Sequence, residues 1–119
     1  KNFNVDRNLL LSAVKRVSIF SNKSTHQIAL QLNSDQASVS TEDPEQSTKA
    51  SEEIKGNYQG DDITVGYNAA YLKDVLSHIN SDEVVVQLKS PISAALFLPK
   101  EQEKNSNLTM LLMPIRLND

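Results

Sequence analysis

The sequence predicts an α+β fold in which two adjacent helices pack on antiparallel β-sheet. Two stretches, residues 7–17 and 69–79, carry apolar side chains at helical spacing. The remaining segments alternate apolar with polar residues or form short apolar runs, and both patterns are typical of strands. Because the order strand, helix and three strands occurs twice, we predict one domain over 1–119 built from two βαβββ repeats, about 1–59 and 60–119. Two layers satisfy these elements, since a helix must cover an apolar stripe and a sheet an apolar face.

The composition limits the function classes. A chain of 119 residues with 39% hydrophobic and 23% charged residues fits one soluble globular domain. It has no cysteine, which excludes a disulfide framework and a thiolate metal site, and we expect no metal and no cofactor. No apolar run approaches the roughly 20 residues that span a bilayer, and residues 1–7 lack a signal-peptide core, so we expect a cytoplasmic protein. The net charge of −3 argues against indiscriminate nucleic-acid binding but not against a local basic face.

The first repeat begins with a short strand at 2–5, and Asp6 is a good N-cap for the helix that follows. Lys15 and Arg16 lie opposite the apolar stripe, on a polar face without an acid; ordinary solvated faces also have this character. The stripe itself is formed by Leu9, Leu10, Ala13, Val14 and Val17.

Two large apolar residues, Ile19 and Phe20, end this helix. Such a pair packs into the core or forms an oligomer contact, and the sequence alone favours the core. A hairpin follows, with strands at 28–32 and 37–41. Residues 43–49 form a polar loop, and 51–59 form one exposed or edge strand that carries the acids Glu52 and Glu53.

The second repeat starts with a strand at 63–65 and has Asn68 as the candidate N-cap of the second helix. Strands are predicted at 83–88, 93–98 and 109–113, with a polar loop at 99–107. A constant displacement of sixty positions relates the two repeats, pairing Phe3, Val5 and Asn8 with Ile63, Val65 and Asn68. The helical stripe is formed by Leu72, Val75, Leu76 and Ile79.

The end of the chain carries an apolar run, 110–113, that meets Pro114. Proline cannot donate to a ladder, so the strand ends there or lies on an edge. Ile115 and Leu117 then follow on a short tail. The tail either tucks into its own core, which the residues alone favour, or lines an apolar groove for a partner.

Catalytic patterns are absent from the sequence. His26 and His78 have no carboxylate at metal-ligand spacing, and none of the three glycines belongs to a nucleotide-binding pattern. The acid pairs Asp61-Asp62 and Glu52-Glu53 are interpreted as solvated surface. A small hydrolase built around Asp61 and His78 is therefore a minority hypothesis, and we expect a protein that is not an enzyme.

At four places the chain resembles the C-terminal domain of the bacterial DNA polymerase III β subunit, the sliding clamp. These are residues 9–22, with Ser21-Asn22 after an apolar pair; Asp43-Pro44-Glu45-Gln46; Val65-Gly66-Tyr67-Asn68 followed by Tyr71 and Asp74-Val75-Leu76; and the ending Met113-Pro114-Ile115-Arg116-Leu117. The resemblance covers essentially the whole chain and implies the DNA-clamp fold. It also implies that the chain is the third domain of a three-domain subunit and lacks the first two.

The resemblance implies a processivity factor in which two subunits close head to tail into a ring around duplex DNA. The polar helix faces would line the central hole, in sequence-independent contact with phosphates. The implied DNA-facing cations are Arg7, Lys15, Arg16, Lys23 and Lys73. The implied joint with the neighbouring subunit comprises the apolar pair Ile19 and Phe20 and the acids Glu45, Glu52 and Glu53.

The resemblance also implies a groove that receives a short clamp-binding peptide of the polymerase, the clamp loader and repair proteins. It comprises Thr25, Asn68, Tyr71, Ile92, Ala94, Leu111, Leu112, Met113, Pro114, Ile115, Arg116 and Leu117. Thr25 replaces a larger aromatic residue found in some members. Asn118 and Asp119 extend past the usual ending, so the resemblance does not provide a terminal carboxylate beside Leu117. The runner-up hypothesis is a free-standing peptide-binding adaptor with the same fold.

Overall fold

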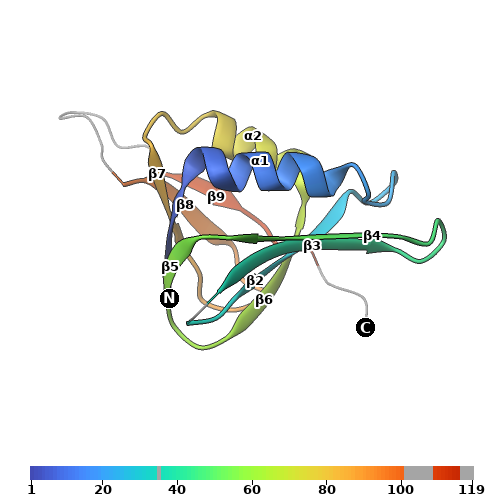
Figure 1. Ribbon diagram of the computed structural model, residues 1–119. Coiled ribbons are helices and arrows are strands. Elements are labelled where there is room, and N and C mark those ends of the chain that lie inside the picture. The colour runs from blue at the N-terminus through green and yellow to red at the C-terminus, as the bar shows by residue number, and fades with distance from the viewer. Residues whose placement is uncertain (35, 101–108, 116–119) are drawn as a thin grey trace.

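A computed structural model describes residues 1–34, 36–100 and 109–115, which form two helices and nine strands (Figure 1). The first half contains β1 (Asn2–Asp6), α1 (Arg7–Ser18), β2 (Gln27–Leu32), β3 (Ala37–Asp43), β4 (Thr48–Ile54) and β5 (Gly56–Gln59). The second half contains β6 (Ile63–Asn68), α2 (Ala69–Ser77), β7 (Glu83–Gln87), β8 (Ala95–Pro99) and β9 (Met110–Leu112). The α+β class and the two helices on antiparallel sheet are confirmed.

The strands form two antiparallel sheets, and each repeat lends its first strand to the other repeat's sheet. One sheet has the order β5-β1-β7-β8-β9, and the other has the order β4-β3-β2-β6. Thus β1 pairs with β7, and β6 pairs with β2. Figure 1 shows α1 and α2 side by side over these sheets. This exchange explains why neither repeat is a separate unit, since each sheet needs strands from both halves.

The constant displacement of sixty positions between the repeats is wrong. The helix N-caps are Asp6, which accepts from the Leu9 amide, and Asn68, which accepts from the Ala70 and Tyr71 amides. These N-caps are 62 positions apart, so Val5 corresponds to Tyr67, and Asn8 is an ordinary residue inside α1. No single displacement fits both repeats, because the connection after α1 is longer than the one after α2.

The single strand predicted at 51–59 is two strands, β4 and β5, which lie in different sheets. The backbone leaves one sheet at Lys55 and enters the other at Gly56. A Cβ at Gly56 would lie 2.4 Å from a ring carbon of Phe3, so a side chain there would displace a buried ring. The loop predicted at 43–49 is shorter than expected, because β3 continues to Asp43 and β4 begins at Thr48.

The core lies between the helix layer and the sheets. The predicted helical stripes are buried except for Leu9, which is 48% exposed. The largest fully buried side chains include Tyr67, Phe3 and Phe97, and the rings of Tyr67 and Phe97 meet edge to face at 6.3 Å. Arg7 Nη1 donates to the Leu76 carbonyl at 3.3 Å and ties the start of α1 to α2. Neither helix in the described part of the chain has the length and apolar content needed to cross a membrane.

Candidate functional site

The C-terminal segment joins the two sheets. After β9 ends at the edge of one sheet, the Ile115 amide donates to the Gly66 carbonyl of β6, the edge strand of the other sheet, at 2.8 Å. Leu112 is buried, whereas Leu111 and Met113 are each 61% exposed. Ile115 in the tail is half-buried, and Leu117 lies outside the described residues, so the choice between a tail in the core and a tail lining a groove stays open. The inclusion of Leu112 among the groove residues needs correction, since this side chain belongs to the core.

Several predicted groove residues gather along this tail. The register of β8 and β9 pairs Ala95 with Leu112, and Ala94 and Met113 are the chain neighbours of this last pair. Ile92, 77% exposed, lies two residues earlier in the same connection. Tyr71 is 65% exposed on α2, a helix in contact with β9.

On the other side, the loop before β2 docks at the start of α2. His26 adopts a left-handed φ of 51° and its carbonyl accepts from the Ala69 amide at 2.8 Å. Asn68 Nδ2 donates to the Thr25 carbonyl at a long 3.5 Å. Thr25 and Asn68 are thus brought together, while Arg116 and Leu117 lie outside the described residues.

The predicted subunit joint is exposed. Ile19 and Phe20 are 65% and 44% exposed at the end of α1, so the interpretation that the residues alone favoured, burial in the core, is wrong. They line a cavity of about 460 Å³ together with Glu45. Thr48 Oγ donates to the Phe20 carbonyl at 3.1 Å and fixes the start of β4 against this cavity. An exposed apolar pair beside an edge strand is a surface suited to a second chain.

Two residues predicted to face different partners bind each other. Arg16 Nε lies 2.7 Å from Glu52 Oε2, and Arg16 Nη2 donates to Glu52 Oε1 at 2.7 Å. The hydrogen bond from Arg16 holds the pKa of the Glu52 carboxyl below its usual range, and the same bond raises the pKa of Arg16. Sequence reasoning missed this pair, because 36 positions separate the two residues.

The other four cations that were predicted to face DNA lie in different environments. Arg7 is engaged by the Leu76 carbonyl, and Lys23 lines the cavity beside Phe20, away from the helix faces. Lys15 is exposed on α1, and Lys73 is half-buried on α2. Among the described residues of the two helices, Lys15 and Lys73 are therefore the cations whose side chains are bound neither by a carboxylate nor by a backbone carbonyl.

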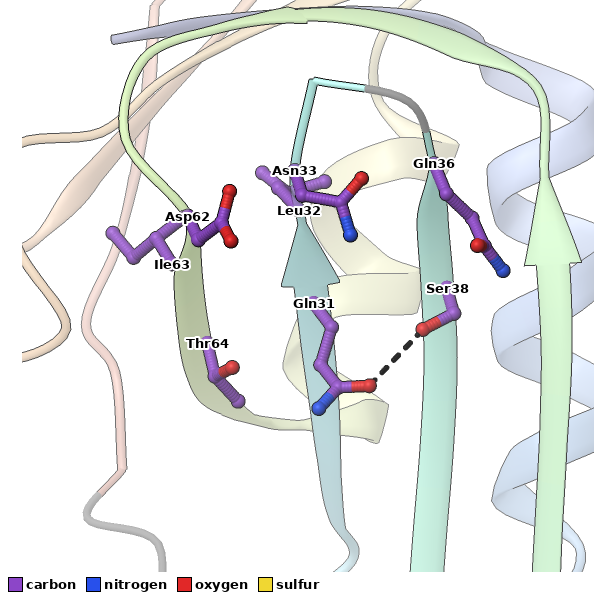
Figure 2. Close-up of a pocket in the computed structure, with 8 residues that line it drawn as sticks. All are labelled: Gln31, Leu32, Asn33, Gln36, Ser38, Asp62, Ile63 and Thr64. Carbon is purple, nitrogen blue, oxygen red and sulfur yellow. Dashed lines mark hydrogen bonds between the residues drawn. The ribbon is translucent and has the colours of Figure 1, made fainter.

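A second hollow lies at the far end of the β2-β3 hairpin. Figure 2 shows this cleft of about 320 Å³, in which Ser38 Oγ donates to Gln31 Oε1 at 3.2 Å. Its lining is mostly amide and hydroxyl groups and includes Asp62 but no predicted site residue. Sequence periodicity gives no signal for it, because Gln31, Ser38 and Thr64 are ordinary outward positions of strands and the other polar lining residues belong to turns.

The structure does not assemble the residues of the hydrolase hypothesis. His78 Nδ1 lies 2.7 Å from the Asp74 carbonyl, one turn earlier in α2. The Asp61 carbonyl accepts from the Tyr58 hydroxyl in the turn between β5 and β6, on the side of the sheets away from the helices (Figure 1). Among the described residues no group of three His, Asp or Glu side chains is arranged to hold a metal ion.

The sequence and the fold both match known proteins. A sequence model of the family described as "DNA polymerase III beta subunit, C-terminal domain" matches residues 1–116. The chain belongs to this family. The resemblance drawn from the residues is thereby confirmed.

Relatives and solved structures agree on the family. The beta sliding clamp of Pseudomonas putida is 35% identical over 112 residues, which cover 94% of this chain and 29% of the relative. The corresponding protein of Escherichia coli is 28% identical over 109 residues, covering 92% of this chain and 29% of the relative.

Among solved structures, the DNA polymerase III subunit beta of Pseudomonas aeruginosa is 32% identical with a TM-score of 0.91, over 98% of this chain and 31% of that one. A sliding clamp of the same organism bound to griselimycin has a TM-score of 0.88 at 31% identity, over 98% of this chain and 30% of the other. The chain thus spans less than a third of the length of the sliding clamps that it matches.

Proposed function

We propose that this chain is the third domain of a three-domain sliding-clamp subunit, a non-enzymatic processivity factor for DNA polymerase. Two such subunits close into a ring around duplex DNA, with α1 and α2 toward the DNA. The groove beside β9 binds short peptide motifs of DNA polymerase III subunits, the clamp loader and repair proteins. Membership of the β-subunit family over residues 1–116 is the observation that carries this proposal.

The exposed surfaces support the proposal. Tyr71, Ile92 and Met113 are all more than half exposed, and exposed apolar residues that form a patch mark interaction sites. Ile19 and Phe20 form a second exposed apolar patch beside the edge strand β4. Two apolar surfaces on one small domain fit a protein that binds a peptide and also a second subunit.

The groove is tested by titrating a peptide with leucine and aromatic anchors into the isolated chain, with chemical shifts as the readout. Two buried anchors contribute roughly 3–6 kcal/mol by area. Peptide ordering and lost translational freedom offset much of this. We therefore expect a Kd on the order of 100 μM or weaker for the isolated domain and tighter binding for the full subunit.

The shifts should centre on Tyr71, Ile92 and Met113, and Met113→Ala should lose them. Leu9→Ala is the matched control, because Leu9 is also an exposed apolar residue but lies on α1. Shifts that map to the helix faces, or unchanged binding by a folded Met113→Ala variant, would refute the groove.

The ring is tested in the full subunit by sedimentation and by retention on circular duplex DNA. The isolated domain should bind duplex DNA barely at all, since one domain cannot encircle it and the net charge is −3. A full subunit that stays monomeric while still binding the peptide would instead favour the adaptor.

A further inference from the structure

The contact between Arg16 and Glu52 joins the end of α1 to the edge strand β4. Both oxygens of the carboxylate are used, at 2.7 Å each, by two nitrogens of one guanidinium group. Such a two-pronged pair fixes orientation as well as distance, because the planar guanidinium group matches the planar carboxylate. Among the described strands, β4 pairs with β3 alone, so the contact with Arg16 helps to determine where the free edge of β4 lies.

A second contact fastens β4 to the turn that directly follows α1. Thr48, at the start of β4, donates from its hydroxyl to the Phe20 carbonyl at 3.1 Å. Thr48 and Glu52 are four positions apart in a strand and therefore face the same side, toward α1. Ala50, between them, packs against the core. The strand is thus held at two points, at Arg16 of α1 and at Phe20 in the turn after it, with a small apolar contact between.

Both contacts lie next to the residues of the predicted subunit joint. Ile19 and Phe20 follow Arg16 by about one helical turn and are exposed, while Glu53, next to Glu52, is exposed on the opposite face of β4. Any chain that binds Ile19, Phe20 and the free edge of β4 together needs these features in a fixed relation. Both contacts provide that relation before the second chain arrives.

We propose that Arg16 and Glu52 are positioning residues that hold the free edge of β4 and the Ile19-Phe20 pair as one preformed docking surface for the second subunit. This inference rests on the proposed ring. It reassigns both residues, because Arg16 then contacts Glu52 instead of DNA, and Glu52 contacts Arg16 instead of the neighbouring subunit. The apolar pair and the edge supply the attraction, and the ion pair supplies the geometry.

The exposure of the pair supports a positioning role over a stabilising one. The Arg16 side chain is 61% exposed and that of Glu52 is 30% exposed. Exposed ion pairs add little to folding stability, because water screens them and two side chains lose freedom. Loss of the pair should therefore leave the domain folded, so its effect on docking can be measured separately. Preorganised surfaces bind more tightly, since less ordering remains to be done on association.

The test uses Arg16→Gln, Glu52→Gln and the charge reversal Arg16→Glu with Glu52→Arg. Lys15→Gln and Glu53→Gln are matched controls, because each removes the same charge from the adjacent position. In the isolated chain, the Arg16 Nε–H resonance should move and exchange faster with water in Glu52→Gln but not in Glu53→Gln. An Arg16 signal that is indifferent to Glu52→Gln would show that the pair does not form in solution and would overturn the inference.

In the full subunit, the dimer dissociation constant should rise about 3- to 10-fold for Arg16→Gln and for Glu52→Gln alike. The charge reversal should recover most of this loss, and Glu53→Gln serves as the reference for loss of a nearby acid. A dimer as tight as the parent's in both single variants would refute the positioning role. A parent subunit that is itself monomeric would instead refute the proposed ring, whatever the behaviour of Arg16 in the isolated chain.

Discussion

The ends of the two helices make an instructive contrast. In both repeats a large apolar residue follows the helix: Ile19 and Phe20 after α1, and Ile79 after α2. Ile79 is completely buried, whereas Ile19 is 65% exposed and Phe20 44% exposed. The same local pattern therefore completes the core in one repeat and forms a surface in the other.

The edge strands β4 and β9 also differ between the two repeats, in their length and in how they are held. In the first repeat, β4 runs for seven residues and is fastened to α1 by Arg16–Glu52 and to the turn after α1 by Thr48–Phe20. In the second repeat, β9 has three residues, is followed by Pro114, and is succeeded by a single backbone bridge from Ile115 to Gly66. A long, fastened edge suits docking of another folded domain, and a short edge with exposed apolar side chains suits a peptide.

The largest effect is expected from removing the exposed apolar pair Ile19 and Phe20. Replacing Ile19 and Phe20 by Ala in the full subunit should convert dimer to monomer, because each side chain is worth roughly 1.5–3 kcal/mol when a partner buries it. Sedimentation velocity measures the change, and thermal unfolding checks that the variant remains folded. A dimer of undiminished affinity would exclude this surface from the joint.

Replacing the buried Ile79 should instead affect folding stability. Ile79→Ala should lower the free energy of unfolding by about 2–5 kcal/mol, because it leaves a cavity in a packed core. Ile19→Ala in the isolated chain should change it by less than about 0.5 kcal/mol, as expected for an exposed position. Urea denaturation of both variants gives the comparison directly. Equal losses would mean that Ile19 is buried in solution and that the contrast between the helix ends is false.

A smaller effect is expected where the repeats differ inside the core. Tyr67 occupies the position that Val5 holds in the first repeat, and its buried hydroxyl has no hydrogen-bond partner among the described residues. Burial raises its pKa above the usual range for tyrosine. Tyr67→Phe should raise the free energy of unfolding by about 1 kcal/mol, because the unpaired hydroxyl is removed while the contact with Phe97 stays.

Tyr58→Phe is the control for this change, since the Tyr58 hydroxyl donates to the Asp61 carbonyl and its removal should not stabilise the domain. Chemical denaturation of the two variants decides the matter. A loss of stability in Tyr67→Phe would mean that the hydroxyl binds a partner in solution.

The smallest expected effect concerns pH and the fastened edge. The pKa of Glu52 is lower in the folded chain than in an unfolded one, since it accepts hydrogen bonds from Arg16. The contribution of the pair is therefore fully present above the unfolded pKa of glutamate and is lost as the pH falls through the lower folded pKa. In a carbon-detected NMR titration, Arg16→Gln should raise the midpoint of Glu52 and Lys15→Gln should leave it in place. An unchanged midpoint in Arg16→Gln would contradict the ion pair.

Local sequence determined where the elements lie and which family they belong to. The stripes at 3.6-residue spacing, together with Asp6 and Asn68 as N-caps, predicted both helices, because capping and periodicity act within a few residues. Four segments carried the family resemblance, and the most specific of them were Val65-Gly66-Tyr67-Asn68 and the ending Met113-Pro114-Ile115-Arg116-Leu117.

Tertiary structure alone decided which residues meet. The exchange of β1 and β6 between sheets, the break of one predicted strand into β4 and β5, and the Arg16–Glu52 pair all join distant parts of the chain. Whether an apolar residue such as Ile19 or Leu112 is covered depends on what the fold brings over it, and no local pattern records that. Periodicity specifies which face of an element is apolar, but only the packing of the whole domain determines which apolar residues remain for a partner.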